Sequence, residues 1–219
     1  MIKACIFDMD GTVVNTINSI AYFANNALNS AGISSIDTEE YKYMVGNGAK
    51  TLVERMINKA GADKSLFNQV FTKYSNDYDN DFLYLTEPYE GIIDMLRAIK
   101  EKGIITTILS NKPHRTAIKV SEALFGSKLI DKCYGARDGI ALKPDPAGVF
   151  EIMNELNLKK EECLYIGDTS TDMKTGKGAG IYTVGVSWGF RERAELEDNG
   201  ADVIVSHPLE LLDIIDKLS

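Results

Sequence analysis

The chain has 219 residues, a length that suits one large domain or a core domain with a smaller insert. Apolar residues make up 44% and charged residues 26%, which is typical of a soluble globular protein. The formal net charge of −8 argues against nucleic acid or an anionic membrane as the main partner. No apolar run approaches the about 20 residues that a membrane-spanning helix needs, and the N-terminus lacks a signal-peptide pattern. We therefore expect a cytoplasmic protein.

The three cysteines, Cys5, Cys133 and Cys163, lie in apolar, strand-like contexts. An odd number of such residues is most simply explained by buried free thiols in a reducing compartment. Nothing near any of them resembles a nucleophile supported by histidine, so we do not expect a catalytic cysteine.

Short continuous apolar runs recur along the chain, as is typical of strands buried on both faces of a parallel sheet. Helical patterns lie between them: one around Ile92–Ile99 that ends before Gly103, one from Pro146 to about Leu156 with Asp145 as its N-cap, and one from Pro208. This alternation predicts an α/β fold with a doubly wound parallel sheet. The expected strands are residues 4–7, 104–109, 164–166, 182–186 and 203–205.

Residues 14–83 break the alternation, because they carry three helical stripes and no convincing strand. The first two stripes end at Gly32 and Gly61, and the third lies around Leu66, Val70 and Tyr74. We therefore expect a Rossmann-like core of residues 1–13 and 84–219 with a helical insert of residues 14–83.

The strongest chemical signal is Asp-Met-Asp-Gly-Thr at residues 8–12, directly after the first expected strand. Ligands of open α/β sheets bind beyond the carboxyl ends of the strands. There, Asp8 could attack phosphorus to form an acyl phosphate, while Asp10 moves protons on and off the leaving group and the water. Gly11 lets the backbone turn so that its amides face a phosphate. The alternative is an ordinary strand-end turn.

Two further segments supply groups that could hold a phosphoryl oxygen. Ser110 and Asn111 follow the second core strand with a hydroxyl and a backbone amide. Lys143 lies just before a predicted helix, where its charge could neutralise a phosphate and the transition state. The alternatives are an ordinary turn at Ser110 and a solvated surface lysine at Lys143.

A last acidic segment, Gly-Asp-Thr-Ser-Thr-Asp at residues 167–172, follows another expected strand. Asp168 and Asp172, with Asp8, offer the hard oxygen ligands that Mg²⁺ prefers. Such an ion would offset the repulsion between Asp8 and an anionic phosphate. Alternatively, Asp172 caps the following helix or pairs with Lys143.

In order and context, these four segments resemble the haloacid dehalogenase-like superfamily of aspartate-nucleophile phosphohydrolases, over essentially the whole chain. The resemblance implies that residues 14–83 form a cap domain, that Asp8 is the nucleophile and that Asp10 is the general acid/base. It further implies that Thr12 supports the loop. The residues that would hold the transferring phosphoryl group are Gly11, Thr12, Ser110, Asn111 and Lys143.

The same resemblance implies a Mg²⁺ cofactor held by the Asp8 carboxylate, the Asp10 backbone carbonyl and Asp168, with Asp172 at or just outside the ion's coordination sphere. Dehalogenases of this superfamily lack the second acid of residues 8–12 and use no metal. Asp10 therefore argues against that branch.

A finer similarity to phosphoglycolate phosphatases rests on residues 45–49, 110–113 and 185–189. It implies that Gly46, Asn47 and Gly48 form a substrate-specificity loop, whose amides could bind a substrate carboxylate. The alternative is a simple helix-entry turn. Lys50 and Arg55 are the nearest cations of the insert, and such helix-surface cations are usually solvated.

We therefore predict a phosphatase that acts on a small organic phosphate monoester, as a monomer or homodimer. Other activities of the same superfamily remain open: a sugar-phosphate mutase, a phosphonate hydrolase or a nucleotidase. From a different class, a non-catalytic regulatory binding protein is an alternative, although such proteins usually lose the nucleophile or a metal ligand.

Overall fold

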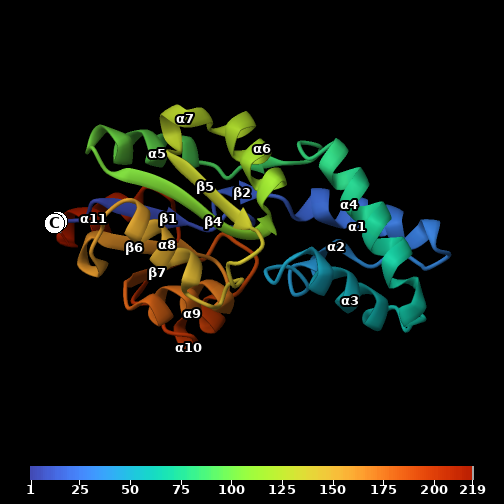
Figure 1. Ribbon diagram of the computed structural model, residues 1–219. Helices are drawn as coiled ribbons and strands as arrows, with labels where there is room; N and C mark the ends of the chain where they lie inside the picture. Colours follow the sequence, from blue (N-terminus) through green and yellow to red (C-terminus); the bar gives the residue numbers. More distant parts are fainter. Residues whose placement is uncertain (219) are drawn as a thin grey trace. The chain divides into compact units, whose positions relative to one another are not determined.

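The computed structural model describes residues 1–218, and the chain divides into two compact units (Figure 1). The first unit comprises Met1–Asn15 and Pro88–Ser219, and the second comprises Thr16–Glu87.

A six-stranded parallel sheet in the order β5-β4-β1-β6-β7-β8 forms the centre of the first unit. Strand β1, near the centre of the sheet, is fully buried because it consists of apolar residues with helices over both faces. The predicted α/β class and doubly wound parallel sheet are confirmed. The strands are β1 (Ala4–Phe7), β4 (Ile105–Pro113), β5 (Lys132–Ala136), β6 (Cys163–Gly167), β7 (Tyr182–Val186) and β8 (Val203–Val205).

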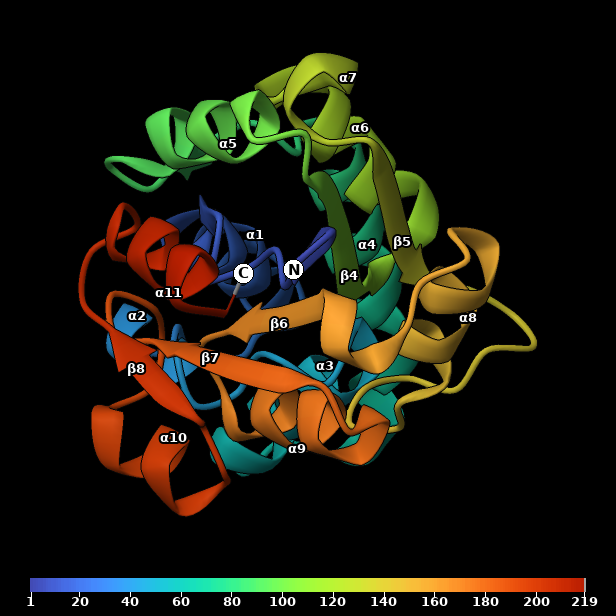
Figure 2. The ribbon, with the colours of Figure 1, turned by 90° about the vertical axis from the view of Figure 1, so that its left-hand side faces the viewer.

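Helices cover both faces of this sheet, with α5 and α11 together on one face and α8 and α9 on the other (Figure 2). On the second face, Val149 and Ile152 of α8 pack with Leu109 of β4 and Tyr165 of β6. The helices are α5 (Ile92–Glu101), α6 (His114–Leu124), α7 (Gly126–Leu129), α8 (Ala147–Glu155), α9 (Ser170–Ala179), α10 (Arg193–Asp198) and α11 (Glu210–Leu218), with a 3-10 turn η2 (Lys160–Glu162).

The register of the sheet brings the polar segments to one edge. Phe7 of β1 pairs with Ile108 of β4 on one side and with Ile166 of β6 on the other. The residues that follow these positions therefore emerge side by side at the carboxyl ends of three adjacent strands. Because the strand order reverses at β1, this edge is also the topological switch point where such sheets bind ligands.

Two expectations about the strands need correction. β5 was not among the expected strands because Lys-Cys-Tyr-Gly-Ala is not an apolar run, and as an edge strand it needs no such run. β4 ends at Pro113 rather than Leu109, so residues 110–113 complete the strand instead of following it. Their pairing with β5 is irregular, with a register shift between Leu109 and Pro113.

The second unit is helical, with α1 (Ile17–Ser30), α2 (Thr38–Tyr41), α3 (Ala49–Lys59) and α4 (Phe67–Asn80) and a 3-10 turn η1 (Lys64–Leu66). α1 and α4 pack against each other. The rings of Phe23 and Tyr78 meet edge to face there, with their centroids 5.5 Å apart. The expectation of no strand from residue 14 onward is wrong for β2 (Val14–Asn15), which pairs with β3 (Glu87–Pro88). A strand of two residues is too short to show a sequence period.

Within residues 1–218, no helix combines the length and the apolar composition that crossing a membrane requires.

Candidate active site

Three buried carboxylates meet at the switch point of the sheet. Asp8 follows β1 directly, Asp168 follows β6, and Asp172 lies in the first turn of α9. One carboxylate oxygen from each lies within 4.8 Å of the other two, and Asp168 and Asp172 are almost completely excluded from solvent. A buried set of oxygen donors of this kind is suited to a divalent cation.

Lys143 lies among these acids. Its Nζ is 2.7 Å from Asp8 Oδ1 and 2.7 Å from Asp172 Oδ1, and its side chain is only 3% exposed. Lys143 is therefore not a solvated surface lysine. Asn111 fixes the backbone of Lys143, because its side-chain amide donates to the Lys143 carbonyl and accepts from the Lys143 N–H, both at 2.9 Å. The side chain of Asn111 is thus engaged with Lys143.

The charge of this cluster is unbalanced, because it holds three carboxylates and one ammonium group. Burial raises the pKa of Asp8 well above its usual value, and Asp172 raises it further, while Lys143 opposes the shift. Burial and then Asp172 raise the pKa of Asp168 to about 7. The pKa of Lys143 is also raised, because Asp172 and Asp8 outweigh the effect of its burial. A divalent cation would offset this excess of negative charge.

Asp168 is held on two sides. Thr12 Oγ1 donates to its Oδ1 at 2.9 Å, and the Phe190 N–H donates to its Oδ2 at 2.8 Å. Two glycines leave room for it: a Cβ on Gly11 (φ +90°) would lie 2.2 Å from Asp168 Oδ2, and one on Gly189 would lie 2.3 Å from Asp168 Cβ. The glycine of residues 8–12 is therefore required both by its backbone angle and by space.

Asp172 both caps α9 and pairs with Lys143, the two alternatives that the sequence left for it. Its Oδ2 accepts from the Thr169 N–H at 3.1 Å and from Thr169 Oγ1 at 2.6 Å, which caps α9. Its Oδ1 accepts from Lys143 at 2.7 Å and from the Tyr165 hydroxyl at 3.3 Å. Four donors occupy this carboxylate, so its clearest role is to hold Lys143 and the start of α9.

Lys112 contacts both Asp10 and Ser110. Lys112 Nζ is 3.0 Å from each carboxylate oxygen of Asp10. The hydroxyl oxygen of Ser110 accepts from the Lys112 N–H at 3.2 Å and can still donate its own hydrogen. Lys112 was not among the functional residues that the sequence indicated. The only signal was its place between Asn111 and Pro113, because its contact depends on the pairing of β1 with β4.

Trp188 belongs to the loop after β7, and its Nε1 donates to the Thr12 carbonyl at 2.9 Å. Through Trp188, the loop therefore contacts residues 8–12. Through Phe190, it contacts Asp168.

The predicted specificity loop of the second unit turns sharply at two glycines. Gly46 has φ +105° and Gly48 has φ +86°, and α3 begins at the next residue. Arg55 of α3 braces this loop, because it donates to the Met44 carbonyl at 2.7 Å and to Asn47 Oδ1 at 2.8 Å. Arg55 is thus a structural partner of the loop rather than a solvated cation, whereas Lys50 is exposed.

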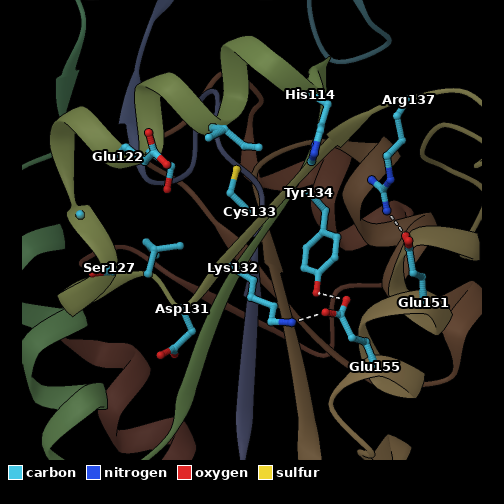
Figure 3. A pocket seen from close by; sticks show the side chains of 14 residues that line it. His114, Glu122, Ser127, Asp131, Lys132, Cys133, Tyr134, Arg137, Glu151 and Glu155 are labelled. Carbon is cyan, nitrogen blue, oxygen red and sulfur yellow. Dashed lines mark hydrogen bonds and ion pairs between the residues drawn. The ribbon is translucent and has the colours of Figure 1, made fainter.

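A separate pocket lies beside β5, lined by residues of α6, α7, β5 and α8 (Figure 3). Four of its charged side chains pair with one another, Lys132 with Glu155 and Arg137 with Glu151, and Asp131 pairs with Lys100. His114 also lines it, and its Nδ1 accepts from the Gly135 N–H at 3.0 Å. His114 is therefore part of the packing between α6 and β5, and the acidic cluster remains the candidate active site.

Comparison with known proteins adds a family to this geometry. The family model described as haloacid dehalogenase-like hydrolase matches residues 5–186. The chain is 30% identical to the N-acetylmuramic acid 6-phosphate phosphatase of Pseudomonas aeruginosa, over 99% of this chain and 96% of that protein. It is 26% identical to the phosphoglycolate phosphatase of Haemophilus influenzae, over 95% of this chain and 96% of that protein.

Solved structures agree on the fold. A crystal structure from Lactobacillus delbrueckii subsp. bulgaricus, described as that of a "putative phosphoglycolate phosphatase", superposes with a TM-score of 0.92. It is 28% identical in sequence, and the match covers 97% of this chain and 98% of that one.

Proposed function

The chain belongs to the haloacid dehalogenase-like hydrolases and is a phosphoric monoester hydrolase; on this premise we propose that it hydrolyses a small carboxylate-bearing phosphate monoester, with Mg²⁺ as cofactor and a phospho-aspartate formed on Asp8. The observation that carries the proposal is the buried cluster of Asp8, Asp168 and Asp172, with the ammonium group of Lys143 in contact with Asp8 and Asp172.

The donor set fits a divalent ion. It is made of hard oxygen atoms, it is buried, and its negative charge exceeds the one positive charge within it. We propose that the carboxylates of Asp8 and Asp168 and the backbone carbonyl of Asp10 hold Mg²⁺, while Asp172 orients Lys143. Bound there, the ion would offset the repulsion between Asp8 and the substrate phosphate.

The residues of the chain then divide the reaction between them. A carboxylate oxygen of Asp8 attacks phosphorus, and the bond from phosphorus to the ester oxygen breaks as Asp10 gives that oxygen a proton. Ser110, the Asn111 amide and Lys143 stabilise the charge on the phosphoryl oxygens. In the second half, Asp10 takes a proton from water as the water attacks phosphorus. The bond to Asp8 breaks, and inorganic phosphate leaves.

The substrate class rests on what the named relatives share. Phosphoglycolate and N-acetylmuramic acid 6-phosphate are both phosphate esters of a primary alcohol, and both carry a carboxylate. We propose that the second unit serves as a cap, and that the amides of Gly46, Asn47 and Gly48 bind this carboxylate. The positive φ angles of the two glycines support the proposal, because such turns point successive amides toward one anion.

The metal part of the proposal is tested by phosphate release after exhaustive chelation. We expect no activity without a divalent ion, full activity with Mg²⁺ and inhibition by Ca²⁺, which takes more ligands at longer distances. Full activity in the chelated protein would contradict the proposal.

The substrate class is tested with matched pairs of phosphoesters. N-acetylmuramic acid 6-phosphate is compared with N-acetylglucosamine 6-phosphate, which lacks the lactyl carboxylate, and 2-phosphoglycolate with ethyl phosphate. We expect kcat/KM to be at least about 100-fold higher for the carboxylate member of one pair, because a site built for a polar group rejects an analogue without it. Equal values within both pairs would exclude this class while leaving the phosphatase activity intact.

A further inference from the structure

Lys112 makes a contact that the reaction described above does not use. It extends from the end of β4, and its Nζ lies 3.0 Å from Oδ1 and 3.0 Å from Oδ2 of Asp10. The Lys112 side chain is 6% exposed and that of Asp10 is 20% exposed. Exposed ion pairs contribute little stabilisation. In this pair, the ammonium group is largely removed from solvent and contacts both oxygens of one carboxylate.

The backbone of Lys112 is held by β5, the neighbour of β4 on the side opposite β1. A Cβ on Gly135 of β5 would lie only 2.7 Å from the Lys112 carbonyl oxygen and 2.5 Å from the Cα of His114. β5 therefore approaches β4 closely here, and the Lys112 N–H is bonded to Ser110 at 3.2 Å. With its backbone held here and its side chain only 6% exposed, Lys112 reaches Asp10 as a largely buried cation.

The carboxylate of Asp10 needs such a partner because of where it lies. Its residue stands in the turn after β1, next to Gly11, and its side chain can rotate about two bonds. A general acid must lie within hydrogen-bond distance of the leaving oxygen, and a displacement of about 1 Å can cost about 100-fold in rate.

We propose that Lys112 is a positioning residue that holds Asp10 in the orientation needed to protonate the leaving group and later to accept a proton from water. This rests on the proposed function, in which Asp10 is the general acid/base. Each of the two acids of residues 8–12 then has its own lysine partner: Lys143 contacts the nucleophile Asp8, and Lys112 contacts Asp10.

A loss of position at Asp10 has a consequence that depends on the leaving group. An alkoxide leaves poorly unless it is protonated, whereas 4-nitrophenolate leaves readily without a proton. The formation of phospho-Asp8 should therefore depend on Asp10 for an alkyl phosphate and much less for 4-nitrophenyl phosphate. The later attack of water needs Asp10 with either substrate.

The test compares Lys112→Met with wild type on 4-nitrophenyl phosphate and on whichever alkyl phosphate the wild type hydrolyses best. In the variant, kcat/KM should fall about 100-fold for the alkyl phosphate and by less than about tenfold for the aryl phosphate, since general acid catalysis contributes about 10²–10⁴-fold. Lys102→Met, at an exposed pair with Asp216, is the matched control and should change neither value.

A second readout separates positioning from a purely structural role. With 4-nitrophenyl phosphate, Lys112→Met should show a burst of nitrophenolate that approaches one equivalent of enzyme, because phospho-Asp8 forms quickly and is hydrolysed slowly. Lys112→Gln should show the same selective loss, so the test does not depend on the Met variant folding. Lys112→Arg, which keeps a cation that can contact both oxygens, should lie closer to wild type than Lys112→Gln.

An equal loss on both substrates, or no loss on either, would overturn the role of Lys112. A failure of the proposed function is a separate outcome: in that case wild-type protein would hydrolyse neither phosphoester.

Discussion

At the scale of single residues, Lys143 shows how the site is held together. Its ammonium group is buried between Asp8 and Asp172, and Asn111 fixes its backbone. A buried ion pair contributes little net stability compared with apolar residues, but removing one partner leaves a buried charge without compensation. We therefore expect Lys143 to matter both for stability and, in the proposed reaction, for activity.

We predict that Lys143→Met destabilises the protein by about 3 kcal/mol in the absence of divalent cations, because two carboxylates then remain buried together. Activity should fall at least about 100-fold, as expected for the loss of a charge that stabilises the transition state. The measurements are urea denaturation near pH 8 and steady-state kinetics.

The control is Lys3→Met, at a pair with Glu162 in which the lysine side chain is 57% exposed. Its effect on stability should stay within about 0.5 kcal/mol. If Lys143→Met were as stable as this control, Lys143 would not be compensating the cluster.

The sequence could predict that Asp8 and Asp168 meet, because each directly follows an apolar strand of a parallel sheet. It could not decide between the roles open to Asp172, which turns out both to cap α9 and to bind Lys143. The contact of Lys112 with Asp10 was not predictable, since it joins residues 102 positions apart and depends on the β1–β4 register. The catalytic roles of these residues remain predictions.

At the scale of elements, the loop between β7 and α10 (residues 187–192) contacts both residues 8–12 and Asp168. Trp188 donates to the Thr12 carbonyl, and the Phe190 N–H donates to Asp168. Gly189 lies between these two contacts, where a Cβ would meet the Gly11 carbonyl oxygen at 2.4 Å. This loop fixes the position of a proposed metal ligand although it follows a different strand.

We predict that Gly189→Ala lowers the free energy of unfolding by about 2 kcal/mol and weakens Mg²⁺ affinity by about tenfold or more, because the methyl group displaces Asp168 or residue 11. The matched control is Gly178→Ala within α9, where the added Cβ meets Pro146 no closer than 3.4 Å. That change should be neutral or stabilising. A Mg²⁺ titration of activity gives the affinity, and the same Mg²⁺ dependence in all three proteins would contradict the prediction.

The loop of Gly46, Asn47 and Gly48 should select the substrate rather than carry out the reaction. We predict that Gly48→Val, at φ +86°, lowers kcat/KM for the carboxylate-bearing substrate about 10–100-fold. Acetyl phosphate, which needs little from the cap, should be affected much less. The decisive quantity is the ratio of the two losses.

Gly61→Val serves as the control for strain alone, because Gly61 lies in the same unit with φ +61° and no atom near its missing Cβ. It should lower stability without changing the substrate ratio. An equal loss on both substrates in Gly48→Val would mean that the loop serves folding or general closure.

The helices and strands were predictable where apolar residues form a continuous run or recur at helical spacing. The apolar runs of β1, β6 and β7 and the stripes of α1, α3 and α4 all coincide with the observed elements. The edge strand β5 and the extension of β4 to Pro113 were missed, because neither has a continuous apolar run. The end of β4 consists of the polar residues of the candidate site, so it lacks the apolar run by which a buried strand is identified in a sequence.

At the scale of the whole molecule, a net charge of −8 must be reconciled with an anionic substrate. The structure places two lysines, Lys112 and Lys143, with side chains at most 6% exposed, at the carboxyl edge of the sheet. The acids at this edge still outnumber these two lysines, so a divalent ion would be needed to offset the remaining negative charge. The fold and the hydrolase family followed from the order of strands, helices and acidic segments, whereas the natural substrate does not.

In the proposed reaction, the phosphoryl group of the substrate is transferred to Asp8 before water releases it. The most direct measurement is rapid acid quenching within the first turnover in the presence of Mg²⁺, followed by mass spectrometry of the peptide that contains Asp8. We predict a transient phosphoryl group on Asp8 that forms and decays at rates consistent with turnover. The Asp8→Asn variant should show neither this group nor activity. Steady phosphate release by Asp8→Asn that has not deamidated, or turnover of wild type with no phosphorylated Asp8 at any quench time, would contradict it.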